Sequence, residues 1–402
     1  MRVLSVHNKY LYRGGEDECR EAERALLREH GHIVFEHVRD NQEINHSIPL
    51  GVGLRAIWSS SDYHAVRRII RENGIDIVSV HNFFPLVSPA VFYAARREGV
   101  PVIQTLHNFR LICAGGLLFR DGKPCELCLE RTVHLPGIKH GCYRANSFAT
   151  AGVAGMLAVH NVLRTWSRLI TAYVVFTEFG KNKFIAGGLP GEKIHVKPNF
   201  VDDPGVGNGN GGFALYVGRL SPEKGINVLL SAWKRLGHRI QLKVVGTGPL
   251  EESARRTYAG TPGIEFLGWR PNPMVQELMG RASVLLFPSM WYEGMPRTLI
   301  EAMAKGTPAI ASNLGAMSTL INHRGNGLHF PAGDEAALAS EVEWMLDHPA
   351  EWHKIRQNAR REYELHYTPD ANYSMLMGIY ENAFSQVHKR RSSALAGASL
   401  GA

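Results

Sequence analysis

Two glutamates eight positions apart, Glu293 and Glu301, lie in the stretch PSMWYEGMPRTLIEAMAKG and are candidates for binding chemistry. A Gly-Met-Pro turn follows the first, and the pattern over 296–305 predicts a helix, with Pro296 suited to its first turn. The start of a helix favours a phosphate group, and a carboxylate beside a phosphate needs hydroxyl groups from which to accept hydrogen bonds. The pair therefore indicates either a phosphorylated, hydroxyl-rich ligand, such as a nucleotide sugar, or an acidic helix start with one surface glutamate.

Two further loops favour the first alternative. YVGRLSPEKG places Arg219 and Lys224 after a predicted strand, as two cations suited to a diphosphate. VVGTGP ends the next strand with Gly246 and Gly248, where the backbone is open to a ligand. Each loop alone is weak evidence, because glycine and lysine commonly follow strands. Three such loops at the carboxyl edge of one sheet indicate a binding site.

The elements that must position these loops read as alternating strands and helices. RVLSV, HIVFEHV, DIVSVHN, PVIQTLHN and AYVVFTE are predicted strands of the first half, with helices over 16–30 and 63–73 among them. The alternation restarts after residue 212 with FALYVG, a helix over 226–236, QLKVVG, IEFLGW, SVLLFPS and PAIAS. The fold class is therefore α/β, with two Rossmann-like domains in tandem.

The boundaries follow from composition. We expect an N-terminal domain at 1–201, a Gly/Pro-rich linker at 202–212 and a C-terminal domain at 213–368. A helix over 369–391 is expected to pack back on the N-terminal domain, and the small-residue tail at 392–402 to be disordered.

Two features of the first half are candidates for the reaction centre. Gly14 and Gly15 stand just before a helix, where their amides could receive an anion or simply form a tight turn. His107 ends the strand PVIQTLHN. A histidine at a strand end is often structural, but the carboxyl edge of a parallel sheet favours an active site.

These motifs resemble glycosyltransferase family 4, whose members have the GT-B fold of two facing Rossmann-like domains with a central cleft. Its Glu-x7-Glu motif matches Glu293 and Glu301, and its Arg and Lys pair matches Arg219 and Lys224. The resemblance covers essentially the whole chain and is strongest over 213–312. The residues that it implies at the donor are Gly14, Gly15, Gly246, Gly248, Gly294, Met295, Pro296, Arg297 and Glu301, and the catalytic ones are Arg219, Lys224, Glu293 and His107.

The resemblance also implies roles and a reaction. Arg219 and Lys224 would neutralise the donor diphosphate, Glu293 would contact the donor sugar, and Glu301 would hold the ribose hydroxyls. The family retains anomeric configuration, by a front-face displacement that needs no metal, and no Asp-x-Asp motif is present. Members often have Asp after the strand-end histidine, whereas this chain has Asn108, so no general base is assigned.

Four of the five cysteines, Cys113, Cys125, Cys128 and Cys142, fall within thirty residues, in an expected insertion at 108–145. Their spacing is compatible with a structural zinc site, to which His134 or His140 could contribute, with free thiols, or with a disulfide. No cofactor is expected for catalysis.

Charge and hydropathy set the remaining expectations. Residues 1–200 hold 25 Lys/Arg and 18 Asp/Glu (net +7), and residues 201–402 hold 20 and 19 (net +1). The first half therefore suits an anionic partner, or has ordinary surface charge. We expect a cytoplasmic protein, peripheral on the inner membrane face, that takes a UDP-, GDP- or ADP-sugar and a saccharide or polyprenyl-linked acceptor. Residues 148–159 read as a buried helix or an interfacial membrane element.

Two other classes fit less well. A sugar-nucleotide epimerase could share the fold, but the residues after Glu293 argue against it. A binder of nucleic acid or another anionic surface would need basic strands with interleaved aromatic residues or a helix-turn-helix, and the sequence has neither.

Overall fold

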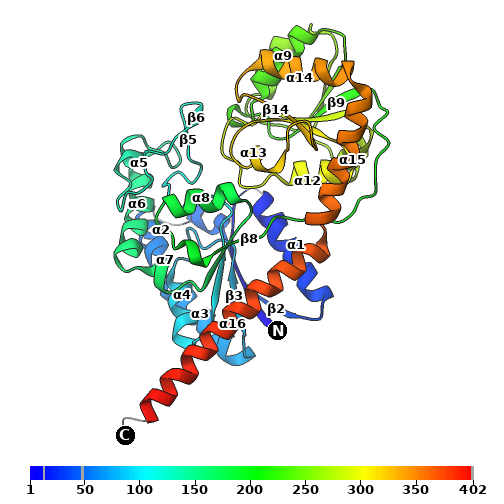
Figure 1. The fold of residues 1–402 in the computed structure, drawn as a ribbon. Coiled ribbons are helices and arrows are strands. Elements are labelled where there is room, and N and C mark those ends of the chain that lie inside the picture. The colour runs from blue at the N-terminus through cyan, green and yellow to red at the C-terminus, as the bar shows by residue number, and fades with distance from the viewer. Residues whose placement is uncertain (12–13, 47–48, 400–402) are drawn as a thin grey trace. The chain divides into compact units, whose positions relative to one another are not determined.

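The computed structural model describes residues 1–11, 14–46 and 49–399 and divides the chain into two units. The first unit comprises Met1–Leu118, Glu126–Lys197 and Tyr373–Ala402, and the second comprises Phe119–Cys125 and Pro198–Asn372. Each unit is a parallel six-stranded sheet with helices on both faces (Figure 1). The predicted α/β fold with two Rossmann-like units is confirmed.

The sheet of the first unit has the order β2-β1-β3-β4-β7-β8. Its strands are β1 (Arg2–Lys9), β2 (Ile33–Asp40), β3 (Ile77–Val80), β4 (Val102–Thr105), β7 (Ala172–Val175) and β8 (Ile194–Val196). Its helices are α1 (Gly15–Glu29), α2 (Pro49–Ile57), α3 (Ser60–Asn73), α4 (Ala90–Glu98), α5 (Leu135–Lys139), α6 (Ser147–Val162), α7 (Thr165–Arg168) and α8 (Glu178–Ala186), with short 3₁₀ helices at Asn41–His46 and Gly191–Lys193.

The last helix of the chain completes the core of this first unit. Helix α16 (Pro369–Ser399) contributes Leu376, Ile379 and Tyr380, which pack against Val3 of β1 and Ile77 of β3. The helix extends past the predicted end at 391, through most of the segment expected to be disordered.

The sheet of the second unit has the order β11-β10-β9-β12-β13-β14. Its strands are β9 (Phe213–Val217), β10 (Gln241–Val245), β11 (Ile264–Gly268), β12 (Val284–Phe287), β13 (Ala309–Ser312) and β14 (Gly327–Phe330). Its helices are α9 (Ile226–Leu236), α10 (Glu251–Tyr258), α11 (Asn272–Arg281), α12 (Arg297–Ala304), α13 (Met317–Leu320), α14 (Glu335–Asp347) and α15 (Pro349–His366), with a 3₁₀ turn at Pro222–Lys224. A two-stranded ribbon pairs β5 (Phe119–Arg120) with β6 (Lys123–Pro124).

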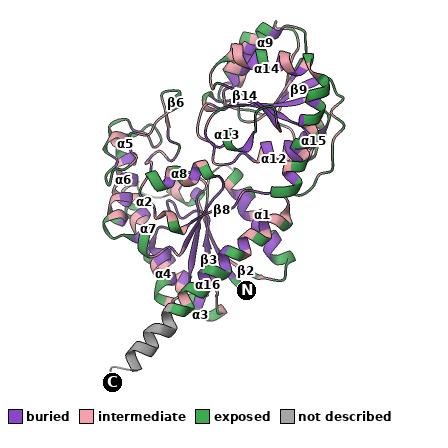
Figure 2. Cartoon of the chain, in the orientation of Figure 1, coloured by how far each residue is buried: buried purple, intermediate pink, exposed green. Residues whose placement is uncertain are grey.

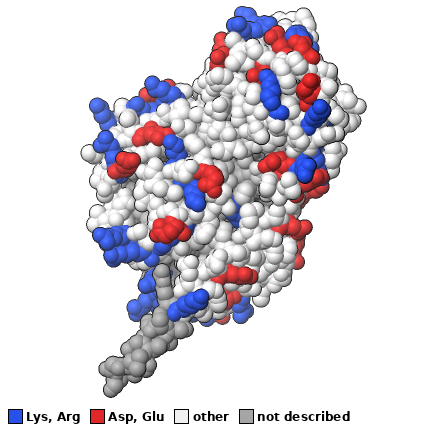
Figure 3. All heavy atoms as spheres, in the orientation of Figure 1, with Lys and Arg blue, Asp and Glu red and all other residues white. Residues whose placement is uncertain are grey.

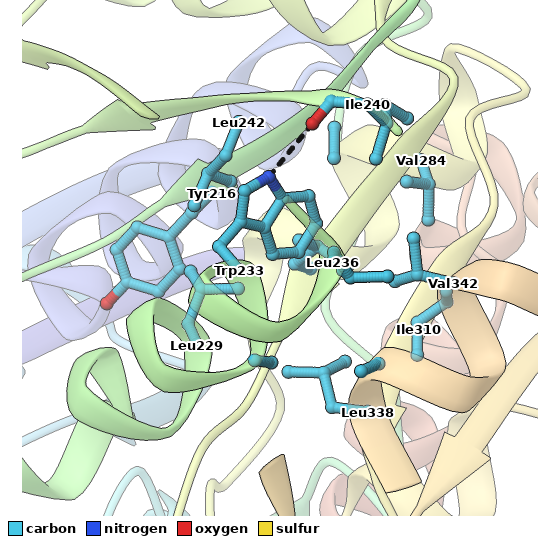
Figure 4. Packing of buried hydrophobic residues seen from close by; sticks show 14 of the residues in the cluster. Tyr216, Leu229, Trp233, Leu236, Ile240, Leu242, Val284, Ile310, Leu338 and Val342 are labelled. Atoms are coloured by element: carbon cyan, nitrogen blue, oxygen red, sulfur yellow. Dashed lines mark hydrogen bonds between the residues drawn. The ribbon is translucent and has the colours of Figure 1, made fainter. Parts of the chain in front are cut away.

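The central strands of both sheets are buried on both faces, as continuous apolar runs such as VLLF of β12 require (Figure 2). In the second unit Trp233 of α9 is fully buried, and its indole Nε1 donates to the carbonyl oxygen of Ile240 at 3.0 Å (Figure 4). This hydrogen bond lets a large aromatic side chain fill the core without leaving a buried donor unpaired.

The Gly/Pro-rich stretch expected to be a linker has a structural place of its own. The amides of Gly207, Gly209 and Gly211 donate to the carbonyl oxygens of Lys305, Gly280 and Arg281, all within the second unit. The unit boundary lies earlier, between Lys197 and Pro198. Glycine suits this stretch because side chains at 207 and 211 would overlap neighbouring backbone.

Helix α6 is not a fully buried helix, and its alternative prediction, an interfacial membrane element, stays a prediction. Val153, Met156 and Leu157 on one face are buried, whereas Phe148 and Val162 on another are largely exposed. Among the described helices, none has the length and apolar character needed to cross a bilayer.

Candidate functional site

The predicted donor residues of the second unit gather at the point where its strand order reverses. Strand β9 lies between β10 and β12, so the loops after β9 and β12 leave the sheet in opposite directions. Ligands of open α/β sheets bind at this point, beyond the carboxyl ends of the strands. Arg219 and Lys224 lie in the loop after β9, and Glu293 lies in the loop after β12.

Lys224 and Glu293 form an ion pair across these two loops. Lys224 Nζ lies 2.6 Å from Glu293 Oε1, and the hydroxyl of Ser289 donates to the same oxygen at 2.8 Å. The carboxylate is buried, while the ammonium group is partly exposed and lies 5.3 Å from the centroid of the Trp291 ring. Arg219 is exposed. The ion pair therefore holds the Lys224 ammonium group in place, whereas the Arg219 guanidinium lies at the surface of the same loop.

Glu301 lies in the second turn of α12. Arg297, one turn earlier on the same face of the helix, lies beside it. Arg297 Nε is 3.9 Å from Glu301 Oε1, and its guanidinium donates to the carbonyl oxygen of Phe200 at 3.1 Å. Pro296 caps the helix rather than occupying its first turn, because its ψ of 114° is extended. Asn199 donates its side-chain amide to the carbonyl oxygen of Met295 at 3.2 Å and so fixes the Gly294–Met295 turn.

The glycines of the neighbouring loops are explained by backbone packing. A side chain at Gly246, where φ is +132°, would overlap the carbonyl oxygen of Gly218, and one at Gly248 would overlap Leu220. Gly225, with φ of +70°, stands equally close to Pro288. These contacts hold the loops after β9, β10 and β12 together. A donor contact by Gly246 and Gly248 stays a prediction.

In the first unit, the strand order reverses between β1 and β3. Gly14 and Gly15 follow β1, at the start of α1, and both are exposed. Neither has a positive φ, and a side chain at either position would meet nothing within 4 Å among the described residues. Packing therefore does not require glycine here, which leaves open the close approach of a ligand to the backbone.

The same dipeptide lies at or just past the ends of three neighbouring strands of this unit. His7-Asn8 precedes Lys9, the last residue of β1, His81-Asn82 directly follows β3, and His107-Asn108 follows β4 after one residue. In the sheet β1 pairs with β3, and β3 with β4. The three imidazoles therefore belong to one sheet edge.

A chain of polar contacts links His107 to a buried ion pair. His107 Nε2 lies 3.1 Å from His81 Nδ1, His81 Nε2 lies 3.3 Å from Glu23 Oε1, and Lys197 Nζ lies 3.2 Å from Glu23 Oε2. The Glu23 and Lys197 side chains are 3% and 2% exposed. A carboxylate accepts, so a neutral His81 carries its proton on Nε2 and accepts through Nδ1 from His107 Nε2–H. In that state Nδ1 of His107 is the unprotonated nitrogen.

Burial sets the charge states along this chain. Desolvation by burial lowers the pKa of His107 well below 6.5, so this imidazole is neutral at pH 7. Burial alone would raise the pKa of Glu23, but Lys197 and His81 outweigh it and hold that pKa below its usual range. With a neutral His81, this series of contacts runs from the Glu23 carboxylate to Nδ1 of His107, which is then a hydrogen-bond acceptor.

Comparisons with known proteins agree with this architecture. Residues 203–362 match the family model described as glycosyl transferases group 1, and residues 14–203 match glycosyltransferase family 4. The phosphatidyl-myo-inositol mannosyltransferase of Mycobacterium leprae is 30% identical over 299 residues, which cover 73% of this chain and 70% of that protein. The chain belongs to glycosyltransferase family 4.

Two other known proteins are similar to this chain, one over part of its sequence and one in its fold. The amylovoran biosynthesis glycosyltransferase AmsK of Erwinia amylovora is 28% identical over 219 residues, which span 50% of this chain and 54% of that protein. The structure of Anabaena Alr3699/HepE in complex with UDP has a TM-score of 0.66, with 16% identity, and the alignment covers 98% of this chain and all of that one. At this identity the likeness shows the shared GT-B fold.

Asn108 belongs to a second polar cluster of the first unit, together with Tyr10 and Glu16. Asn108 Nδ2 donates to the Tyr10 hydroxyl at 3.3 Å and lies 3.5 Å from Glu16 Oε2. Burial, together with the charge of Asp17, raises the pKa of Glu16 well above its ordinary value. A buried carboxyl group with a raised pKa beside a candidate site is a functional signal that our sequence analysis missed.

Three further residues of this site, His81, Glu23 and Lys197, were not predicted from the sequence. The repeated His-Asn dipeptide at three strand ends was the available signal for His81. Glu23 and Lys197 carried none, because Glu23 lies in the middle of α1 and Lys197 lies 174 positions away, directly after β8.

The structure places two cysteines of the insertion, Cys128 and Cys142, beside glycines of the same insertion. Cys113 and Cys125 are free thiols. Cys128 Sγ would be 3.5 Å from a side chain at Gly137, and Cys142 packs beside Gly115, so these two residues lie in the folded insertion. Cys125 belongs to the residues grouped with the second unit. Among the described residues no three His, Cys, Asp or Glu side chains could hold a metal ion, and the zinc site stays a prediction.

Proposed function

We propose that this chain is a retaining, metal-independent hexosyltransferase that moves a sugar from a nucleotide-diphosphate-sugar donor to a saccharide or lipid-linked acceptor. The single observation that carries the proposal is the Lys224–Glu293 pair at the point where the strand order of the second unit reverses. A cation suited to a diphosphate stands beside a carboxylate suited to sugar hydroxyls, at the place where such sheets bind nucleotides.

The donor residues have complementary roles in this proposal. Lys224 and Arg219 bind the diphosphate and stabilise the charge that develops on it as the glycosidic bond breaks. Glu293 accepts hydrogen bonds from the donor sugar, and Glu301 accepts them from the ribose. The helix dipole of α12 adds a favourable potential for the phosphates between them. The complexes of Alr3699/HepE with UDP and with UDP-glucose support a nucleotide-sugar donor.

His107 serves as a neutral hydrogen-bond partner of the reacting sugar. Its Nδ1 accepts from a sugar hydroxyl, because its Nε2–H is engaged by His81. His81 and Glu23 act as positioning residues, since they fix the tautomer of His107. A neutral imidazole can orient the sugar without placing a second positive charge beside an oxocarbenium-like centre.

The acceptor is proposed to belong to surface polysaccharide or glycoconjugate synthesis. The names of two relatives support this, since one acts in amylovoran biosynthesis and the other on phosphatidyl-myo-inositol. A lipid-linked acceptor accords with the excess positive charge of residues 1–200.

A donor screen tests the proposal. UDP-, GDP- and ADP-sugars are added to the full chain, and thermal unfolding and release of nucleoside diphosphate are measured. A bound donor raises the melting temperature in proportion to the logarithm of its concentration. We expect one nucleotide class to stabilise the protein and to be hydrolysed slowly. The absence of both effects with all three classes would refute the proposal.

A further inference from the structure

An apolar groove of about 520 Å³ lies in the first unit between α2 and α6. Val52, Leu54 and Ile57 line it from α2, and Phe148, Gly152 and Gly155 line it from α6. Among the residues that the structure describes, a side chain at Gly152 or Gly155 would meet nothing within 4 Å, so the two glycines leave the groove open. Its volume lies in the range of sites that bind small molecules.

The rim of the groove is unusually apolar for an exposed surface. Leu54 is 62% exposed and Phe148 is 72% exposed, and Val162 continues the same side of α6 at 75%. None of the 16 residues of α6 is Asp, Glu, Lys or Arg. A contiguous exposed apolar surface of this kind marks a contact with a partner, a ligand or a membrane.

The charges around the groove point to an anionic amphiphile. Residues 131–177 contain no Asp or Glu, and their five cations are Arg131, Lys139, Arg144, Arg164 and Arg168. All five are exposed, and Arg144 lines one end of the groove. Figure 3 shows Lys and Arg atoms along the margin of the molecule where α5, α6 and α7 lie. Cations beside an apolar surface suit the phosphates of a lipid surface.

The groove adjoins the cavity at His107 through one shared residue. Phe84 lines the groove and also the small cavity lined by His81, His107 and Arg110. The Arg110 guanidinium lies 4.6 Å from the centroid of the Phe84 ring and 5.1 Å from that of Tyr143. A ligand could therefore place a hydrocarbon chain in the groove, a phosphate near the arginines and a sugar toward His107.

We propose that the α2–α6 groove binds the hydrocarbon chain of a lipid-linked acceptor at an anionic membrane surface. This proposal rests on the proposed transferase function, because it gives that reaction its acceptor class. The phosphate of the acceptor pairs with Arg144, and Phe148 and Leu54 enter the apolar part of the bilayer. A saccharide acceptor without a lipid would make no apolar contact with this groove or its rim.

Binding of farnesyl phosphate and of vesicles tests the proposal on the full chain. The vesicles contain phosphatidylglycerol with phosphatidylcholine, or phosphatidylcholine alone, and inorganic phosphate serves as the control for the farnesyl chain. We expect farnesyl phosphate, but not phosphate, to raise the melting temperature, and the protein to sediment with the anionic vesicles. Phe148→Ser and Leu54→Ser should each weaken vesicle binding roughly tenfold, and Arg144→Gln about fivefold.

Two variants keep the test independent of folding. Gly152→Leu fills the groove with a better helix former and should abolish the effect of farnesyl phosphate. Gly378→Leu is its control, because Gly378 is an exposed glycine of α16 whose side-chain position has no described residue within 4 Å. Leu365→Ser in α15 is the control for Leu54→Ser, since Leu365 is 57% exposed.

The outcomes separate this proposal from the proposed function. Unchanged lipid binding in Gly152→Leu and Phe148→Ser would overturn the groove assignment, as would a wild-type protein that hydrolyses a nucleotide sugar but binds neither farnesyl phosphate nor vesicles. Vesicle binding that resists the groove variants would indicate another surface and would also overturn it. Loss of farnesyl phosphate binding in Gly152→Leu, with donor hydrolysis unchanged, would support it. Lipid binding without any nucleotide-sugar binding would instead refute the transferase and leave a lipid-binding groove.

Discussion

Replacement of Lys224 by alanine should reduce turnover far more than stability. Turnover should fall because the variant lacks a preorganised cation at the leaving diphosphate. The loss of one such group raises the activation free energy by about 3–4 kcal/mol, which lowers the rate roughly 10²–10³-fold. In stability it leaves the buried carboxylate of Glu293 without its ion-pair partner at 2.6 Å, although the Ser289 hydroxyl still donates to it. Because Lys224 is partly exposed, we expect about 1–2 kcal/mol of lost stability.

The assay is release of nucleoside diphosphate at saturating donor, with thermal unfolding measured on the same samples. Lys234→Ala, at an exposed lysine of α9, is the matched control and should leave both quantities unchanged. Lys224→Ala/Glu293→Gln should recover stability, because the unpaired charge is removed, but should not recover turnover. Recovery of turnover in the double variant, or a turnover loss below about tenfold in Lys224→Ala, would refute the assigned role of Lys224.

Three further predictions follow from the sites. Glu301→Ala should weaken nucleotide binding about 10- to 100-fold and remove the preference for a ribonucleotide over its dideoxy analogue; titration calorimetry that finds the preference intact would contradict the ribose contact. Glu23→Gln should lower stability by about 3–5 kcal/mol, since it removes the buried carboxylate that pairs with the Lys197 ammonium group, and Lys197→Met added to it should restore much of the loss in urea unfolding. The free energy of unfolding should fall as pH decreases below 6.5, because His107 becomes protonated in the unfolded chain, whereas its lowered pKa keeps it neutral in the folded protein. A His107→Gln variant whose stability has the same pH dependence would contradict this.

Much of the scaffold could be predicted from the sequence because long elements have strong patterns. The predicted helix over 226–236 is α9 to the residue, and the helix predicted at 296–305 is α12 with one residue fewer at each end. The edge strands β8 and β14 escaped prediction, since IHV and GLHF are short and a histidine interrupts each apolar run. The Gly/Pro-rich stretch at 202–212 was misread for a different reason. Glycine was needed there for close packing on the second unit rather than for freedom of movement.

The placement of the candidate donor residues was easier to predict than that of the residues around His107. Lys224 and Glu293 each follow a strand, so topology alone brings them to one sheet edge. The residues behind His107 depend on side-chain packing instead. Glu23 faces His81 and Lys197 because α1 lays one face against the sheet, and spacing along the sequence does not show which face that is. The open groove beside α6 likewise depends on what packs around Gly152 and Gly155, not on their identity.

The return of α16 to the first unit also sets the order in which the chain can fold during synthesis. Val3 and Ile77 are made before the second unit, but Leu376, Ile379 and Tyr380, which cover them, are made after it. Pro198–Asn372 forms most of the second unit as one continuous segment and can fold while the ribosome is still adding residues. The half of the protein that is translated first is therefore the last to complete its core, and a fragment that stops at Lys197 would expose that core to solvent.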